Sequence, residues 1–261
     1  MRILIRTSKW AIWARRFGSL ALPLVVVPVL LHREQLISSS DFMVVEAVAI
    51  AVAVLAVLLA LGAYGRLWVT GDQGWSKASW GLMLGVICLL PFAWFGYQAW
   101  RHPMVSAVST DFIDPPRLVS AKPGPQSLDD RRTIEAAFPN ARSRSYPIEA
   151  TQMFTVVEDL ARAQGWEIRT ARAPTSALDM GTLTAVDATL FGWRDEVAMR
   201  VRGSNQGATI DMRSAPLHAG PDFGSNGQRI EAFLVELDSR ITLMLRDAPV
   251  SPTTGVLDER G

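Results

Sequence analysis

The sequence predicts an α+β fold in two parts: three N-terminal transmembrane helices, then an antiparallel sheet with two helices on one face. Three apolar blocks fall within the first 100 residues, and residues 101–261 contain none. In that second part, short segments alternate between polar and apolar residues, and two longer ones carry apolar residues at helical spacing. Alternating strands with polar outer faces indicate an antiparallel sheet that helices cover on one side only.

The second and third apolar blocks are long enough to cross a bilayer. A spanning helix needs about 20 mostly apolar residues. Residues 42–65 give 24 residues with one charge, Glu46, and residues 79–100 give 22 residues with none. Glu46 lies five residues past Asp41, near the interface, so we assign it no function. We predict transmembrane helices at about 14–32, 42–65 and 79–100.

The first block is shorter, because its uncharged run covers only residues 17–31. It reaches spanning length if Arg15 and Arg16 extend their charged ends to the headgroups. A cleaved signal peptide is the alternative, but no small-residue cleavage site follows the block. We therefore predict that it inserts, and the sidedness of the protein depends on that insertion.

The charges near the spans indicate their orientation. The N-terminal tail has five basic residues and no acidic one: Arg2, Arg6, Lys9, Arg15 and Arg16. Such a tail stays in the cytoplasm. Arginine outnumbers lysine 23 to 3, which is typical of a GC-rich bacterial genome. Three spans then put residue 101 onward on the periplasmic side of the bacterial cytoplasmic (inner) membrane; with two spans, that part would be cytoplasmic.

Composition excludes several kinds of partner and site. Residues 101–261 hold 18 basic and 21 acidic residues, a net charge of −3, which argues against a nucleic-acid partner. The lone cysteine, Cys88, lies in the third span, so no disulfide, thiolate nucleophile or cysteine metal site is expected beyond it. With only His102 and His218 available there, we predict no metal site, and we predict no cofactor.

The soluble part divides at composition shifts. Residues 101–141 form a Pro-rich arm or linker with prolines at 103, 115, 116, 123 and 125, which favour extended backbone. Residues 129–137 could form a short helix within it, with Ser127 as its cap. We predict an α+β domain over residues 142–247 and a disordered tail over residues 248–261.

Periodicity defines the elements of this domain. We predict strands at residues 144–148, 166–171, 182–193, 196–202 and 208–214, and helices at residues 151–164 and 226–246. The order β-α-β-β-β-β-α is similar to that of the TATA-binding-protein and helix-grip folds. This is an analogy of element order and carries no implication of nucleic-acid binding.

The register of the last hairpin follows from matching apolar faces. We expect Val201 opposite Ile210 and Met199 opposite Met212, with residues 204–207 as a four-residue loop. The same register puts Arg200 directly across from Asp211, a pair worth about 0.2–1 kcal/mol if exposed.

Three further arginines, Arg169, Arg202 and Arg213, should share the helix-free face with the Arg200–Asp211 pair. Such a face could bind an anion or a lipid headgroup. A solvated sheet surface is the simpler interpretation.

Four segments carry a resemblance to a known family. They are Val108-Ser109-Thr110-Asp111-Phe112-Ile113-Asp114-Pro115-Pro116, Tyr146-Pro147, Ile210-Asp211-Met212-Arg213-Ser214 and Asp222-Phe223-Gly224-Ser225-Asn226-Gly227-Gln228-Arg229-Ile230. Together they resemble domain-of-unknown-function family 1499, over about residues 105–245. The resemblance implies a bacterial membrane-anchored or secreted protein, with relatives in photosynthetic organelles, and it implies no activity. Residues 215–219 depart from the family pattern, which has a small polar stretch with an arginine there, so a site using that arginine is not carried over.

The same motifs define a candidate ligand site. The start of a helix binds anions through its free N–H groups, and an arginine at the end of the preceding strand could close such a pocket. The candidate ligand-binding residues are Arg200, Asp211, Arg213, Asp222, Asn226 and Arg229. The simpler interpretation is a structural network that docks the arm, through Asp111 and Asp114, onto the domain.

These observations favour a non-enzymatic binding or accessory domain of the cell envelope, whose partner is a lipid, a small molecule or an envelope protein. The rival is a hydrolase or transferase that uses Asp211, Arg213, Asp222 and Arg229. We predict no catalytic residue: Ser214, His218 and Asp222 share one short loop without a nucleophile elbow. A third interpretation gives the domain a purely structural role and the membrane helices the partner interface.

Overall fold

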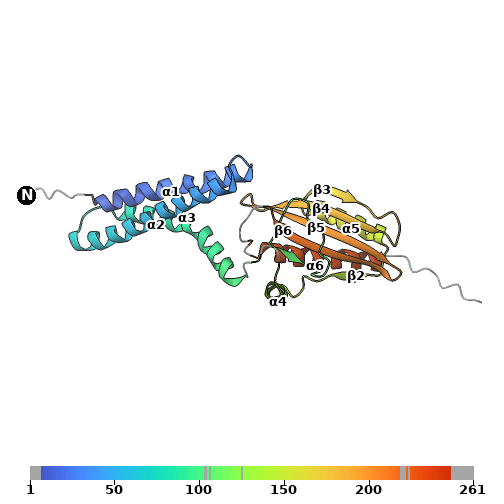
Figure 1. Cartoon of the computed structure of the whole chain (residues 1–261). Helices are drawn as coiled ribbons and strands as arrows, with labels where there is room; N and C mark the ends of the chain where they lie inside the picture. Colours follow the sequence, from blue (N-terminus) through green and yellow to red (C-terminus); the bar gives the residue numbers. More distant parts are fainter. Residues whose placement is uncertain are drawn as a thin grey trace, which may run out of the picture.

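The protein consists of three long helices followed by an α+β domain (Figure 1). The computed structural model describes residues 7–102, 105, 107–124, 126–217, 222 and 224–247. The predicted fold class is confirmed. The predicted disordered tail, residues 248–261, lies outside the described residues, as does His218.

Helices α1 (Lys9–Arg33), α2 (Ser39–Thr70) and α3 (Trp75–Arg101) are each long and apolar enough to cross a membrane. All three extend beyond the predicted spans. Helix α1 begins before Trp10 and Trp13 and reaches 25 residues, about 37 Å at 1.5 Å per residue. The helix with the weakest apolar run is thus still long enough for a hydrocarbon core of about 30 Å.

Small residues join the three helices along one seam. The buried positions of the seam, most of them small residues, recur at alternating three- and four-residue intervals, the spacing of left-handed coiled coils. They are Ala11, Ala14, Gly18 and Ala21 in α1, Phe42, Glu46, Ala49, Ala53, Ala56, Ala60, Ala63 and Leu67 in α2, and Ala78, Gly81, Gly85 and Cys88 in α3. Small side chains let membrane helices approach closely: a Cβ added to Gly18 would lie 2.8 Å from the carbonyl oxygen of Gly81. The first apolar block is therefore packed into the bundle.

The domain is built on one antiparallel sheet. Its elements are β1 (Val108–Ser109), α4 (Leu128–Ala137), β2 (Arg144–Tyr146), α5 (Ala150–Ala163), β3 (Glu167–Arg172), β4 (Met180–Ala188), β5 (Arg194–Ser204), β6 (Gly207–Pro216) and α6 (Ser225–Asp247). The strand order is β1-β6-β5-β4-β3, and β2 also pairs with β6. Helix α4 has the expected cap: Ser127 accepts from the N–H of Asp130, and Asp130 accepts from that of Ser127.

The β5–β6 hairpin has the predicted register. Val201 pairs with Ile210, Met199 with Met212, and Arg200 with Asp211. The ladder continues to Ser204 and Gly207, so the loop has two residues rather than the predicted four. The alternation of apolar side chains fixes the register, because a slip by one residue would turn every side chain to the opposite face.

Helices α5 and α6 cover one face of the sheet and form the main core with it. Fully buried side chains of both layers meet there: Met153, Leu160, Leu183, Met199, Ile210, Met212, Ile230, Phe233, Leu234 and Leu237.

The sequence predicts an opposite face that is open to water. The arm instead covers this face over part of β5 and β6, while β3 stays exposed. Strand β1, which was not predicted, pairs with β6. Ala107 and Ala121 of the arm pack on Ala215 of β6. The sequence predicts that Asp111 and Asp114 dock the arm onto the domain, but Pro-rich extended chain has no hydrophobic period, so the pattern does not indicate which face the arm covers.

The predicted strand 182–193 is too long. Strand β4 ends at Ala188, and residues 189–193 form a turn in which Gly192 donates its N–H to the carbonyl oxygen of Thr189. Gly192 has φ +83°, a conformation that glycine adopts readily. The apolar pair Leu190-Phe191 extended the strand pattern, although its side chains belong to the turn.

Candidate functional site

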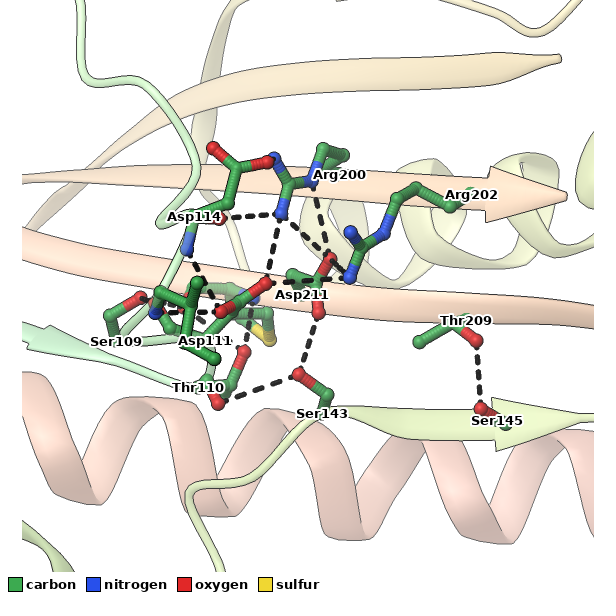
Figure 2. A network of polar contacts seen from close by, with 12 residues as sticks. Ser109, Thr110, Asp111, Asp114, Ser143, Ser145, Arg200, Arg202, Thr209 and Asp211 are labelled. Carbon is green, nitrogen blue, oxygen red and sulfur yellow. Dashed lines mark hydrogen bonds and ion pairs between the residues drawn. The ribbon is translucent and has the colours of Figure 1, made fainter.

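The centre of the arm-covered face is an ion-pair cluster around Arg200 (Figure 2). Arg200 projects from β5, and its Nε and Nη2 donate to Oδ2 of Asp211 on β6 at 3.2 and 3.1 Å. The side chain of Asp211 is 0% exposed and that of Arg200 only 9%. The predicted pair is therefore a buried one, unlike an exposed pair of small energetic value.

The arm supplies the other acceptors for Arg200. Its Nη1 donates to Asp114 Oδ2 at 2.7 Å, and its Nη2 donates to the Asp114 carbonyl oxygen at 2.6 Å and to Asp111 Oδ2 at 3.3 Å. Burial alone would raise the pKa of Asp111. The backbone N–H groups of Asp114 and Ile113, together with Arg202 and Arg200, more than offset this and hold that pKa below its ordinary value. The arm is thus fastened by two carboxylates to one buried guanidinium.

A second fastening, absent from the predicted set, is made by Glu196 on β5. Its carboxylate accepts the backbone N–H groups of Val119, Ser120 and Ala121, at 2.6, 2.9 and 2.5 Å. Glu196 is 1% exposed. The alternation of β5 predicts that the side chain of Glu196 points away from the helices. The structure shows that the arm lies over it there.

The other arginines of this face have different surroundings. Arg202 forms ion pairs with Asp211 at 2.8 Å and Asp111 at 3.4 Å. Arg169 pairs with Glu167 on β3, away from the cluster. Arg213 forms no ion pair with any described residue, its Nε is buried without an acceptor, and burial lowers its pKa.

The remaining predicted residues lie on the helix-covered face, around Arg229 of α6. Its Nε donates to Asp187 Oδ2 at 2.7 Å and its Nη2 to Asp195 Oδ2 at 2.6 Å. Its Nη1 donates to Ser214 Oγ and Asn226 Oδ1. Burial raises the pKa of Asp195, and Arg229 offsets only part of that rise. Neither Asp187 nor Asp195 was among the predicted residues.

Asp222 caps the start of α6. Its carboxylate accepts the N–H groups of Gly224 and Asn226 at 3.1 and 3.2 Å. The helix N-terminus that could have held an anion is thus occupied by a carboxylate of the chain. The structure therefore divides the six predicted residues between opposite faces of the sheet, with Arg213 outside both ion-pair clusters. Their ligand role stays a prediction.

An accessible hollow lies beside the Arg200 cluster, with a volume of about 420 Å³. Its lining residues are Thr110, Phe112, Ile134, Glu135, Phe138, Ala141, Arg142 and Ser143. The aromatic and aliphatic side chains come from the arm and α4, and the polar ones from the arm, α4 and the segment before β2. Ser143 connects the hollow to the cluster, because its Oγ donates to Asp211 Oδ1 at 2.6 Å (Figure 2).

Comparison with family models assigns residues 107–237 to the family described as Protein of unknown function (DUF1499). The match covers half of the chain. The chain belongs to DUF1499. The predicted resemblance is thereby confirmed. A search of curated proteins and a search of solved structures gave no match.

The DUF1499 match includes the arm, both ion-pair clusters and the hollow, and it excludes the three long helices. Within the described part of the chain, no group of three His, Cys, Asp or Glu side chains could hold a metal ion. The DUF1499 region offers buried ion pairs and several surface hollows, of which the one described here lies beside the Arg200 cluster.

Proposed function

We propose that this DUF1499 protein holds a non-enzymatic binding or accessory domain at the periplasmic face of the bacterial cytoplasmic membrane. Three features support the sidedness. The N-terminal tail is basic without acidic residues, three helices are long and apolar enough to span, and α1 packs with the other two along a seam of small residues.

The hollow beside the Arg200 cluster carries the binding proposal. Its aromatic and aliphatic lining provides apolar contact area, while Arg142 and Glu135 provide charges at its edge. Small-molecule sites combine apolar side chains with a few placed polar groups, and the lining of this hollow contains both kinds. We propose an amphipathic ligand, a lipid or a small molecule, whose anionic group pairs with Arg142.

The state of the carboxylates favours binding over catalysis. At the hollow, the hydroxyl of Ser143 donates to the carboxylate of Asp211. Asp211 also pairs with Arg200 and Arg202, so both of its carboxylate oxygens are already bonded to groups of the chain. A hydrolase or transferase that uses Asp211, Arg213, Asp222 and Arg229 would have to draw them from opposite faces of the sheet.

The test compares ligands that stay bound to the full-length protein after gentle solubilisation of membranes, by lipid and protein mass spectrometry. We expect wild type to retain a ligand that Arg142→Glu loses. Arg132→Glu is the matched control, because Arg132 lies on α4, is exposed and does not line the hollow. Identical ligands on all three proteins would refute the site at the hollow. Loss from an Asp211→Ala, Arg213→Ala double variant of matched stability, with retention by Arg142→Glu, would favour the originally predicted residues.

A further inference from the structure

The turn between β4 and β5, residues 189–193, is seated on the end of the helix bundle. His32, at the end of α1, donates from Nδ1 to the carbonyl oxygen of Phe191 at 2.7 Å. Gln35, just after α1, donates from Nε2 to the carbonyl oxygen of Gly192 at 3.1 Å. The contact is close, since a Cβ on Gly192 would lie 2.6 Å from Cα of Arg33.

Aromatic rings surround this contact. The rings of His32 and Phe42 stack at 4.5 Å between centroids, and Trp193 packs edge-on against both, at 5.0 and 5.8 Å. On the other side, Phe191 packs edge-on against Phe95 of α3, at 4.9 Å. The turn therefore joins α1, α2 and α3 at the same end of the bundle.

A second connection holds the domain at this end. His102, directly after α3, stacks on Phe138 with the ring planes 6° apart, and it forms a hydrogen bond with Gln228 of α6. The domain is thus attached at two points rather than by a single flexible linker, consistent with its position at the end of the bundle in Figure 1.

The end of α1 sets the depth of the turn in a bilayer. Arg33 closes the apolar run of that helix, and a charged residue at the end of a spanning helix lies at headgroup level. Aromatic residues gather at the same level in membrane proteins. Here Trp94, Tyr97 and Trp100 of α3 are exposed at the end of the bundle that contacts the turn, as expected for an interfacial belt.

Leu190, at the tip of this turn, is 70% exposed. It follows a strand whose Leu183 and Ala185 lie in the core, and its neighbours Phe191 and Trp193 already pack on the bundle. An exposed leucine at headgroup level removes apolar surface from water if it enters the upper acyl region.

We propose that residues 189–193 are a membrane-interface anchor: the turn lies in the headgroup layer, Leu190 enters the upper acyl region, and the sheet is thereby held in a fixed orientation to the bilayer. The partner is the phospholipid interface itself. The proposal rests on the helices being in a bilayer and is independent of the ligand proposed for the hollow.

The test places an environment-sensitive fluorophore on a cysteine in the full-length Cys88→Ala protein, reconstituted in phosphatidylethanolamine–phosphatidylglycerol vesicles. Leu190→Cys is compared with Leu178→Cys, since Leu178 is a similarly exposed leucine at the opposite end of β4. We expect a blue-shifted emission at position 190 and several-fold stronger quenching by lipids with a nitroxide near the headgroup, with water-like behaviour at position 178.

Water-like emission and no quenching at position 190 would overturn the proposal. Shielding of that position in native membranes but not in pure lipid would also overturn it, in favour of a protein partner. A Gly192→Val variant separates insertion from mere proximity: a side chain there meets the backbone of Arg33, so the turn should lift and quenching at position 190 should fall. If the Gly192→Val variant displaces the turn from His32 but leaves quenching at position 190 unchanged, the depth of Leu190 does not depend on the contact of the turn with α1.

Discussion

Asp187 and Asp195 are direct partners across β4 and β5, and a single guanidinium, that of Arg229, bonds to both. Like charges directly opposite each other destabilise a sheet, so this pair depends on the helix that supplies the arginine. The two strands lead into and out of the turn 189–193. Arg229 thus links α6 to the two strand ends that flank the turn 189–193, which contacts the three long helices.

Replacing Arg229 should destabilise the domain strongly. In an Arg229→Met variant, two carboxylates would remain buried or half-buried without a counter-charge, which costs about 3–5 kcal/mol. Denaturant unfolding in detergent measures the change. Arg240→Met is the matched control: Arg240 also lies on α6 but pairs with Glu236 at the surface, so its loss should cost under about 1 kcal/mol. Equal small effects of both variants would show that the cluster contributes little.

The raised pKa of Asp195 predicts a pH dependence with a definite sign. Because its pKa in the folded state exceeds the ordinary value of 3.8, the folded protein binds this proton more tightly than the unfolded chain. The contribution of Asp195 to stability therefore falls as the pH rises from below 3.8 through the raised pKa. The stability of wild type minus that of Asp195→Asn, measured by unfolding at a series of pH values, should decrease over that window. A difference that increases with pH would mean that Arg229 outweighs burial.

Much of the fold was predictable because its elements have strict periods. Apolar alternation in β5 and β6 determines which side chains face the core, and that requirement alone aligns Arg200 with Asp211. Helix α6 carries its apolar residues at helical spacing and ends near the predicted residues.

The site was predicted less completely, because it depends on segments without a period. The arm covers part of a face expected to be solvated. Glu196 therefore binds the backbone of the arm, a role that its position in the strand does not reveal. The apolar residues Leu190 and Phe191 make the pattern predict strand at residues 189–193, where the structure has a turn. Phe191 is apolar because it contacts the helix bundle, and Leu190, on our proposal, because it contacts lipid. A pattern of hydrophobicity does not distinguish such contacts from burial in the core of a sheet.

Glu196 should control the docking of the arm. Glu196→Ala leaves three buried or half-buried backbone N–H groups without their acceptor, at a cost of about 1–3 kcal/mol for each that stays unsatisfied. Hydrogen exchange should increase at residues 119–121 well before it increases in the sheet. The control is Glu167→Ala, which removes only an exposed ion pair with Arg169. Unchanged exchange at residues 119–121 would show that other contacts hold the arm.

The sidedness of the domain is the claim on which the proposed function depends most, and cysteine labelling in intact spheroplasts tests it directly. The Cys88→Ala protein would carry one cysteine at Asn205, in the exposed β5–β6 turn, or at Thr70, at the end of α2 on the opposite side of the bundle. A membrane-impermeant maleimide should label position 205 fully before permeabilisation and position 70 only afterwards. Labelling of position 70 alone in intact spheroplasts would contradict the periplasmic assignment.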